Sequence, residues 1–377
     1  MATTTESIEE LLEKFWRVES CEDHPAWSKE EQDCEEHIRA THSRSEEGRY
    51  VIQLPKCVNW DHMLGESRVT ALNRYRKLEN RLEHDINMKE QYHAFMKEYL
   101  AMGHMRLLTQ AEQLEESKGL ERPRVYYLPH HAVVKESSFT TRVRVVFDAS
   151  ARTDSGYSLN NILLKGPQIQ DDLFILLIRF RKHEVALVGD VEKMYRQILL
   201  DTKDILRLRI FLRFTKDGPI DVYELLTVTY GLTPSSFLAT RALQQLAEDE
   251  GKEGTKSRSA LLKDLYVDDY IGGASTVDEA IELRKDLTSL MAKGGFPIRK
   301  WCSNRPEVLS GIPEDQLGTI LTIKFELNPE EKVQTLGITW KPKADQLKFC
   351  YQVGAYEGKW TRRRILSIIA KLFDPPA

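Results

Sequence analysis

The sequence predicts an α+β fold, in which helices cover a sheet of mixed strand order. Two observations predict this class. Apolar residues recur at helical spacing in some segments, and β-branched or aromatic residues alternate with polar ones in the segments between them. Hydrophobic residues form 41% of the 377-residue chain, so a sizeable core is expected. The sequence has no internal repeat that would indicate a repeat array instead.

Composition also argues against a membrane-spanning or secreted protein. No run approaches the ~20 apolar residues that span a bilayer, and none is typical of a secretory signal. The five cysteines are an odd number without any Cys-x-x-Cys spacing, which argues against a disulfide framework. We therefore expect a cytoplasmic protein without a membrane partner.

The net charge of -4 is unevenly distributed along the chain. Residues 1 to 40 hold twelve acidic and four basic residues, which leaves a net charge of +4 for the remainder. A mildly basic remainder permits contacts with phosphates, because binding depends on a local stripe of charge rather than on the total.

The first region, residues 1–120, is expected to be acidic and mainly helical. An apolar face with helical spacing begins it (Ile8, Leu11, Leu12 and Phe15). A strand is predicted over 49–55 and ends at Pro55. Two helices are then predicted over 67–116, joined near Asn87.

The second region, residues 121–350, begins where the composition changes at Arg122-Pro123. Helices are predicted over 170–182, over 234–250 with Thr233 as cap and Pro234 at the first helical position, and over 276–293 before Gly294-Gly295. Strands are predicted between them, at 126–128, 132–134, 143–147, 185–190, 207–214, 221–226, 262–271 and 333–350. Residues 351–377 are expected to begin a further unit.

The most informative segment places two adjacent aspartates between strand-forming residues and a glycine pair. Asp268 and Asp269 follow Tyr266-Val267 and precede Tyr270-Ile271-Gly272-Gly273, as at the tip of a hairpin. A half-buried acidic pair needs a cation to neutralise it, and Mg²⁺ prefers such hard oxygen ligands. The alternative is an ordinary turn with solvated aspartates.

A second apolar strand delivers Asp190 at its carboxyl end, 78 residues before Asp268. A strand end beside a hairpin tip would bring the third carboxylate into the same site. Two metal ions about 4 Å apart, bridged by such carboxylates, activate a hydroxyl nucleophile and stabilise a leaving pyrophosphate. A helix N-cap is the alternative role for Asp190.

The order and the residue motifs of these segments resemble those of the reverse transcriptases of Pao/BEL-type retrotransposons. The resemblance is carried by Tyr266-Val-Asp-Asp269, Gly189-Asp-Val-Glu-Lys-Met-Tyr195, Arg49-Tyr-Val51 and Gly103-His-Met105, and it extends from about Phe15 to Pro375. It implies a right-hand fold, with fingers and palm in residues 121–350 and the truncated start of the thumb or connection in residues 351–377. It also implies an RNA-directed DNA polymerase that uses Mg²⁺, or Mn²⁺ in its place, and deoxynucleoside triphosphates to extend a primer on an RNA or DNA template.

The resemblance assigns a role to several further residues. Lys135 and Arg144 match residues that hold the incoming triphosphate, and Tyr195 matches the aromatic gate that excludes a 2′-hydroxyl. Tyr230 and Gly231 match a turn that supports the template and nucleotide, although Pro234 stands closer to Gly231 than in many relatives. Lys300 matches the lysine that protonates pyrophosphate. Leu336, Gly337 and Trp340 match the hairpin that grips the primer end.

Two other functions remain open. One is a non-catalytic retrotransposon remnant, because the sequence stops at Ala377, where the resemblance leads us to expect a thumb, a ribonuclease H domain and an integrase. The other is a two-metal nuclease, which the matches at Lys135, Arg144 and Tyr195 disfavour.

Three further motifs are interpreted as structural. Asp154-Ser-Gly156 matches the tripeptide of retroviral aspartic proteases, but it lacks flanking apolar strands, so a loop is expected. Cys21-x-x-His24 and Cys34-x-x-His37 have zinc-ligand spacing, yet the surrounding acidic residues favour a solvated helix. His130-His131 is expected to be structural, and Arg362-Arg-Arg364 to be either a phosphate contact or a solvated helix face.

Overall fold

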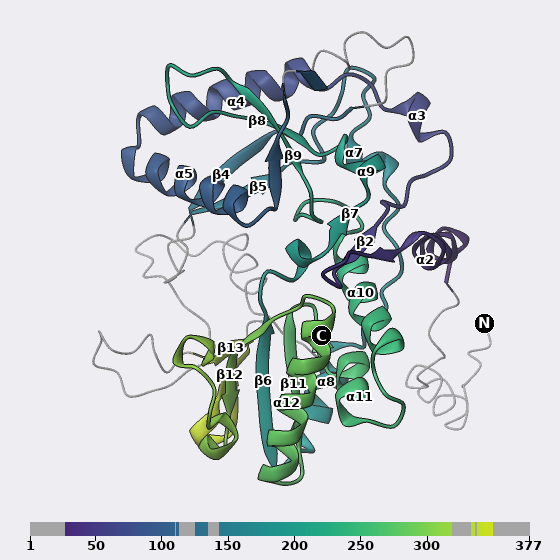
Figure 1. Cartoon of the computed structure of the whole chain (residues 1–377), viewed down its shortest axis with the longest axis vertical. Helices are drawn as coiled ribbons and strands as arrows, with labels where there is room; N and C mark the ends of the chain where they lie inside the picture. Colours follow the sequence, from purple (N-terminus) through teal and green to yellow (C-terminus); the bar gives the residue numbers. More distant parts are fainter. Residues whose placement is uncertain are drawn as a thin grey trace, which may run out of the picture.

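The computed structural model describes residues 27–109, 111–112, 125–134, 143–318, 333–335 and 338–349. These residues form two lobes, one above the other in Figure 1, with a small sheet and a long helix between them. Most of them share one hydrophobic core, which extends from Cys34 to Val308. The helices of the first sequence region therefore pack against strands of the second.

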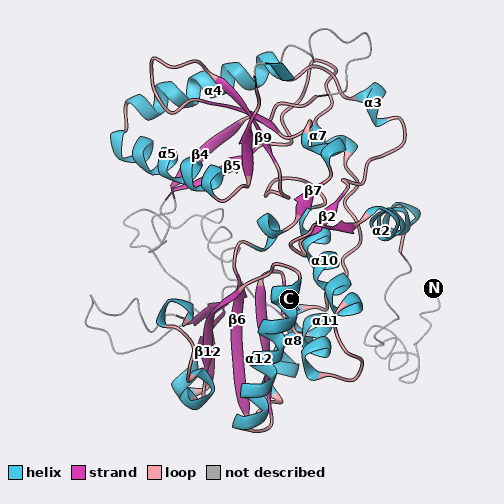
Figure 2. Cartoon of the chain, viewed as in Figure 1, coloured by secondary structure: helices cyan, strands magenta, loops and turns pink. Residues whose placement is uncertain are grey.

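The upper lobe consists of two long helices over two small antiparallel sheets (Figures 1 and 2). The helices are α4 (Arg68–Glu83) and α5 (Ile86–Ala101), and Asp85 caps α5 by accepting a hydrogen bond from the Met88 amide. One sheet pairs β4 (His130–Val134) with β5 (Val143–Phe147). The other has the order β3 (Met105–Leu107), β9 (Asp221–Leu225), β8 (Arg209–Leu212).

The middle layer joins the lobes. It holds β1 (Ser43–Arg44), β2 (Tyr50–Ile52) and β7 (Leu199–Leu200), with β2 parallel to β7. The helices α2 (Lys29–Thr41) and α10 (Ser235–Asp249) lie beside this sheet (Figure 1). Arg241 of α10 binds Glu35 of α2 through a buried ion pair of 2.8 Å. Because a buried ion needs a partner, this contact fixes one helix against the other.

The lower lobe is built on an antiparallel sheet with the order β10 (Leu265–Tyr266), β11 (Asp269–Ala274), β6 (Val185–Val191), β12 (Ile298–Ser303). Successive strand residues point to opposite faces. Leu187, Tyr270 and Trp301 belong to the main core, whose helices include α12 (Val277–Lys293) and α11 (Lys256–Lys263).

The other face of this sheet forms a second, smaller core. Its buried residues are Phe180, Ala186, Val188, Ile271, Cys302 and Trp340. Phe180 belongs to α8 (Leu173–Arg181), and Trp340 belongs to a three-stranded sheet of β13 (Val333–Thr335), β14 (Ile338–Lys341) and β15 (Gln346–Phe349). The apolar residues of this second face therefore pack against α8 and the sheet that holds β14.

Short elements complete the described chain. They are α3 (Trp60–Met63), α7 (Leu159–Ile162), α9 (Thr202–Ile205) and the 3₁₀ turns η1 (Met194–Gln197), η2 (Pro306–Leu309), η3 (Glu314–Gln316) and η5 (Pro342–Ala344). No helix within the described residues combines the length and the apolar character that crossing a bilayer requires.

Several sequence predictions of local structure were wrong. The strand predicted over 333–350 is interrupted by η5, which separates β14 from β15, and the strand predicted over 126–128 is only an isolated bridge at Tyr127. The strand predicted over 262–271 begins instead as the end of α11, because Thr255 caps that helix and Ala260 and Leu261 are buried by it. The cap of α10 is Pro234 rather than Thr233, whose amide donates to Asn160 Oδ1 at 2.9 Å. The second helix predicted within 67–116 ends at Ala101, where Gly103 adopts a φ of 69° and β3 follows.

Candidate active site

Two of the predicted carboxylates are cross-strand neighbours. Asp190 is the penultimate residue of β6 and Asp269 is the first of β11, and the two are paired directly in the antiparallel register. Such partners have Cβ atoms about 5 Å apart. By strand alternation Asp190 shares a face with Val188, and Asp269 with Ile271, so both aspartates lie on the face of the second core.

Asp268 occupies the turn that leads into β11. Tyr266 pairs with Asp269, so Val267 and Asp268 form a two-residue connection. Val267 has a φ of 53°, which a β-branched residue adopts only under strain. The Val191 amide donates to the Asp268 carbonyl at 2.7 Å, which holds the turn against the end of β6. The hairpin predicted from the Asp-Asp pair is therefore present, and its tip lies next to Asp190.

Lys300 reaches the same carboxylates from the opposite side of β6. The pairing of β12 with β6 shifts between Arg299 and Cys302, and Lys300 within this bulge has a φ of 55°. Its ammonium donates to Asp190 Oδ2 at 2.9 Å. Next to it, Arg299 Nε lies 2.7 Å from Glu192 Oε2. The bulge thus aims the Lys300 side chain at the carboxylate group, since bulges re-aim side chains at such positions.

Crowding and burial raise the pKa values of two of these carboxyl groups. Burial, together with the charges of Asp268 and Asp190, raises the pKa of Asp269 to about 7. Burial and the charge of Asp190 also raise the pKa of Asp268, while Lys300 and Arg144 act in the opposite direction. Carboxylates with raised pKa values at one sheet edge are typical of a site that binds cations or transfers protons.

The donor set suits a hard divalent cation, because three carboxylates supply the oxygen ligands that Mg²⁺ prefers. Within the described residues, however, no three His, Cys, Asp or Glu side chains stand close enough together to form a ready-made metal cluster. Lys300 already binds one oxygen of Asp190. The residues therefore fit a metal in their chemistry and shared position, and binding would require their side chains to rotate.

Aromatic side chains lie beside these acids. Tyr195 in η1 is 7% exposed, and its ring centroid lies 4.6 Å from that of Tyr230. Its hydroxyl shares a hydrogen bond of 3.2 Å with Ser236 Oγ. Burial and the charge of Asp268 raise the pKa of both tyrosines. The two rings therefore line the approach to Asp268.

The turn at Gly231 is shaped by its contact with β5. Gly231 has a φ of 97°, and a Cβ there would lie 2.3 Å from the Phe147 carbonyl oxygen. Asn160 holds the turn from the other side, since its amide donates to the Gly231 carbonyl at 2.8 Å. Only glycine satisfies both the backbone conformation and the close approach.

Arg144 acts on the site from the upper lobe. It lies on β5 opposite Val133 and is exposed. Its charge partly opposes the rise in the pKa values of Asp268 and Tyr230. The structure thus brings together Asp190, Asp268, Asp269 and Lys300, with Tyr195, Tyr230 and Gly231 in a second group joined by ring and turn contacts.

Of the remaining predicted site residues, only one belongs to the described part of the chain, and it is buried in the second core. Lys135, Leu336 and Gly337 lie outside the described residues. Trp340 is 2% exposed and packs edge-on against Phe180, with ring centroids 5.2 Å apart. In this structure Trp340 anchors β14 to the second core, and its predicted contact with a primer stays a prediction.

Several motifs interpreted as structural have described residues in structural positions, whereas Arg362-Arg-Arg364 lies outside the described residues. Asp154 lies in a loop and accepts a hydrogen bond of 2.7 Å from the Glu66 amide. Buried His130 bonds the Tyr92 hydroxyl at 2.7 Å. Cys34 is buried in the core, and Cys21 and His24 lie outside the described residues.

Sequence reasoning missed two residues that support the site. Asn160 joins the Gly231 turn to α10, and Ser236 bonds the Tyr195 hydroxyl. Asn160 sits in a capping segment, Ser158-Leu-Asn-Asn161, where an asparagine predicts only a helix start. Its partner is 71 residues away, so no local pattern indicates this role.

Comparisons with known proteins give remote structural likenesses only. No protein-family model matches the chain, and no curated protein matches it. A solved structure of prototype foamy virus protease-reverse transcriptase is similar, with a TM-score of 0.40 and 13% identity over 57% of this chain and 24% of that one. A foamy viral protease-reverse transcriptase in complex with double-stranded DNA is also similar, with a TM-score of 0.44 and 15% identity over 72% of this chain and 37% of that one. Neither likeness is close enough to assign an activity, and this chain spans well under half of either relative.

Proposed function

We propose that this chain is the fingers and palm of an RNA-directed DNA polymerase of the Pao/BEL retrotransposon type. The upper lobe is the fingers and the lower lobe is the palm. The observation that carries the proposal is the direct pairing of Asp190 with Asp269, beside the Asp268 turn and within range of Arg144 from the other lobe. Its reaction is the attack of a primer 3′-hydroxyl on a deoxynucleoside triphosphate, directed by an RNA or DNA template, with pyrophosphate leaving.

The metal ligands in this proposal are Asp190, Asp268 and Asp269. These residues would hold Mg²⁺, or Mn²⁺ in its place, which when bound would neutralise the crowded carboxylates and the charge that develops during nucleotidyl transfer. The raised pKa values of Asp268 and Asp269 support a cationic ligand, because their ionised forms are unfavourable without one.

The other residues position the substrates. Arg144, with Lys135, binds the triphosphate oxygens, for which an exposed guanidinium facing the carboxylates is suited. Tyr195 presents its ring to the sugar and excludes a 2′-hydroxyl, while Tyr230 and Gly231 support the nucleotide and template strand. Lys300 Nζ gives a proton to the leaving pyrophosphate, and Leu336, Gly337 and Trp340 support the primer end.

A second function, a non-catalytic remnant that binds nucleic acid, is favoured by one observation. The Lys300–Asp190 ion pair neutralises part of the carboxylate group without any metal. A chain that had lost catalysis would retain such a pair for stability alone.

Primer extension decides between the two. Asp268→Asn should abolish extension without lowering the melting temperature, whereas the exposed Asp286→Asn on α12 should leave both unchanged. Extension should be measured on this chain and on a version supplied with a thumb, since weak grip on the template would hide a competent site. If neither version extends a primer, and if Mg²⁺ raises the melting temperature of neither version, the polymerase proposal is wrong. The non-catalytic remnant is then the better interpretation.

A further inference from the structure

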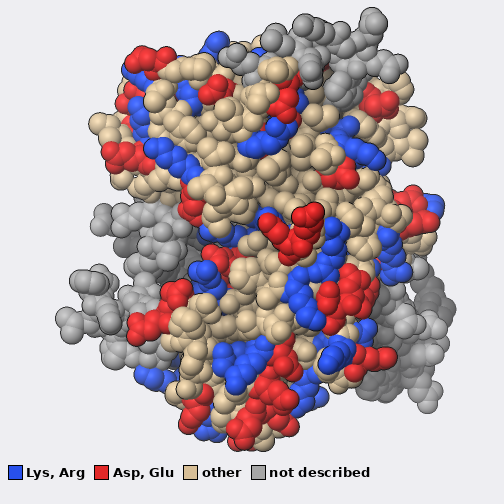
Figure 3. Space-filling model, in the orientation of Figure 1, with Lys and Arg blue, Asp and Glu red and all other residues tan. Residues whose placement is uncertain are grey.

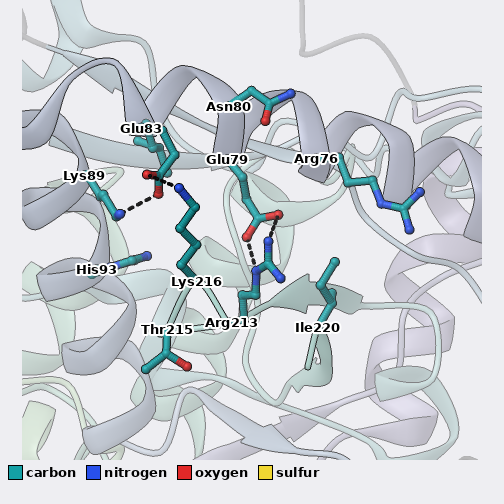
Figure 4. A pocket seen from close by; sticks show the side chains of 11 residues that line it. Arg76, Glu79, Asn80, Glu83, Lys89, His93, Arg213, Thr215, Lys216 and Ile220 are labelled. Atoms are coloured by element: carbon teal, nitrogen blue, oxygen red, sulfur yellow. Dashed lines mark hydrogen bonds and ion pairs between the residues drawn. The ribbon is translucent and has the colours of Figure 1, made fainter. Parts of the chain in front are cut away.

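The charged side chains on the two flanks of α4 differ in whether they have partners of opposite charge. The helix buries Ala71, Tyr75, Leu78 and Leu82. On one flank Glu79 and Glu83 point toward the β8–β9 turn, where basic side chains neutralise them. Arg213 binds both oxygens of Glu79 at 2.5 and 3.1 Å, and Lys216 lies 3.3 Å from Glu83 (Figure 4). On this flank both carboxylates have basic partners.

The opposite flank carries Arg74, Lys77 and Arg81, which we call the α4 basic row. Their spacing of three and four residues places them on one side of the helix, and all three are exposed. Arg74 pairs with Asp148 at 2.5 Å, whereas no carboxylate of the described residues pairs with Lys77 or Arg81. Elsewhere, on the face drawn in Figure 3, basic and acidic side chains are interspersed over both lobes. Within the row, Lys77 and Arg81 therefore carry positive charges that no carboxylate of the described residues neutralises.

A cavity of about 330 Å³ lies against this row. Its other lining residues include Pro129, His130, His131 and Asp148. His130 is buried and bonded to Tyr92, which leaves the exposed imidazole of His131 as an open ring surface. A line of cations beside a hollow with an exposed ring is the combination that binds single-stranded nucleic acid, in which phosphates follow the cations and an unstacked base enters the hollow.

The row is also continuous with the candidate active site. Asp148, which pairs with Arg74, directly follows β5, and Arg144 lies four residues earlier on that strand. The Phe147 carbonyl of β5 also packs closely against the Gly231 turn of the candidate site. Four strand residues span about 13 Å, so a strand leaving the site needs only a few nucleotides to reach the row.

We propose that the α4 basic row and its cavity bind a single-stranded stretch of RNA or DNA, with phosphates on Lys77 and Arg81 and a base against His131. The identity of that strand, the unpaired template ahead of the primer end, rests on the proposed polymerase function. A paired duplex fits less well, because its bases are stacked and do not enter a hollow.

Fluorescence anisotropy with three probes tests this surface. The probes are a blunt primer–template duplex, the same duplex with a 5′ template overhang of about ten nucleotides, and the overhang strand alone. The variant is Lys77→Gln with Arg81→Gln. The control is Arg76→Gln, which removes one positive charge from an exposed residue on the other flank of α4 and is compared with each single variant, Lys77→Gln and Arg81→Gln, as well as with the double variant.

Losing two phosphate contacts should weaken binding of the overhang probe about tenfold at 0.15 M salt and make the log–log salt slope less steep by about 1.4. Binding of the blunt duplex should stay unchanged, and Arg76→Gln should bind like the parent. His131→Ala should weaken overhang binding without altering the salt slope, because it removes a ring and no fixed charge.

Overhang binding equal to that of the parent in the double variant would overturn the proposal. So would competition by poly-glutamate as effective as that by the single strand, which would indicate an acidic protein partner. A parent chain that binds the single strand through the row but binds no primer–template would overturn the polymerase function and leave the row in place.

Discussion

The Lys300 ammonium lies 2.9 Å from Asp190 Oδ2, so one proposed metal ligand is already bound to a positive charge within the chain. In the proposed polymerase, a metal ion would compete with this ammonium for the same oxygen. Lys300 would then be a counter-ion in the metal-free chain and would become free for pyrophosphate only after metal binding.

Replacing this lysine should change stability and metal affinity in opposite directions. Lys300→Met should lower the melting temperature in metal-free buffer, because crowded carboxylates lose their counter-ion. It should raise the affinity for Mn²⁺, measured by titration calorimetry, because no ammonium has to be displaced. Lys285→Met, at an exposed site on α12, serves as the control. Equal Mn²⁺ affinity in parent and Lys300→Met would rule out the competition.

The pH dependence of stability should report Asp269. Its pKa rises from 3.8 to about 7 in the folded chain, so folding binds its proton more tightly than the unfolded chain does. This group favours folding most below pH 4, and its contribution is lost as the pH rises through 7. In metal-free buffer Asp269→Asn should therefore flatten the fall in unfolding free energy between pH 4 and 7, by an amount of the order of a few kcal/mol. An unchanged slope in denaturant titrations would contradict the burial of this carboxyl.

Sugar discrimination should depend on the Tyr195 ring. Tyr195→Val should admit ribonucleotides more readily while retaining much deoxynucleotide extension, whereas Tyr195→Phe keeps the ring and should discriminate like the parent. Ser236→Ala removes only the 3.2 Å hydroxyl contact and should have a smaller effect. Single-nucleotide incorporation with matched ribo- and deoxynucleotides measures this. Identical selectivity in the parent and the valine variant would remove the gate from Tyr195.

Gly231 should tolerate a side chain less well than another glycine of similar conformation. Gly231→Ala brings a Cβ to 2.3 Å from the Phe147 carbonyl oxygen, whereas Gly254, with a φ of 78°, has no heavy atom within 4 Å of such a Cβ. Gly254→Ala should cost about 1 kcal/mol for the backbone conformation alone. Gly231→Ala should cost about 2 kcal/mol more, because a backbone carbonyl has to shift. Equal losses in denaturant unfolding would show that the turn adapts freely.

Local patterns predicted the strands that hold the carboxylates. Val185 to Val188 are apolar and lead directly to Asp190, and the glycine pair after Ile271 marks the strand after the turn. The helix at 276–293 was predicted nearly to the residue, because Thr276 caps it and Gly294 follows it. These signals lie within a few residues of the feature that they predict.

The features that sequence reasoning missed depend on distant partners. The bulge at Lys300 arises from the pairing of β12 with β6, which lies more than a hundred residues earlier. Leu261, Leu262 and Leu265 form an apolar run typical of a strand, yet packing against α10 and α12 makes its first part helical. The alternation around Trp340 does not reveal which face of the hairpin meets Phe180. Tertiary contacts decide such cases.

Asp190 also stabilises the observed register of β6 against β11 relative to a shifted register. If these strands paired one residue out of step, Asp190 would project into the main core and Val191 would take its place on the other face. That chain would keep its helices and its compactness, yet it would bury an unpaired carboxylate among apolar side chains. The same aspartate that the proposed reaction would require thus also penalises the misregistered fold, so one side chain would serve both catalysis and the choice of strand register.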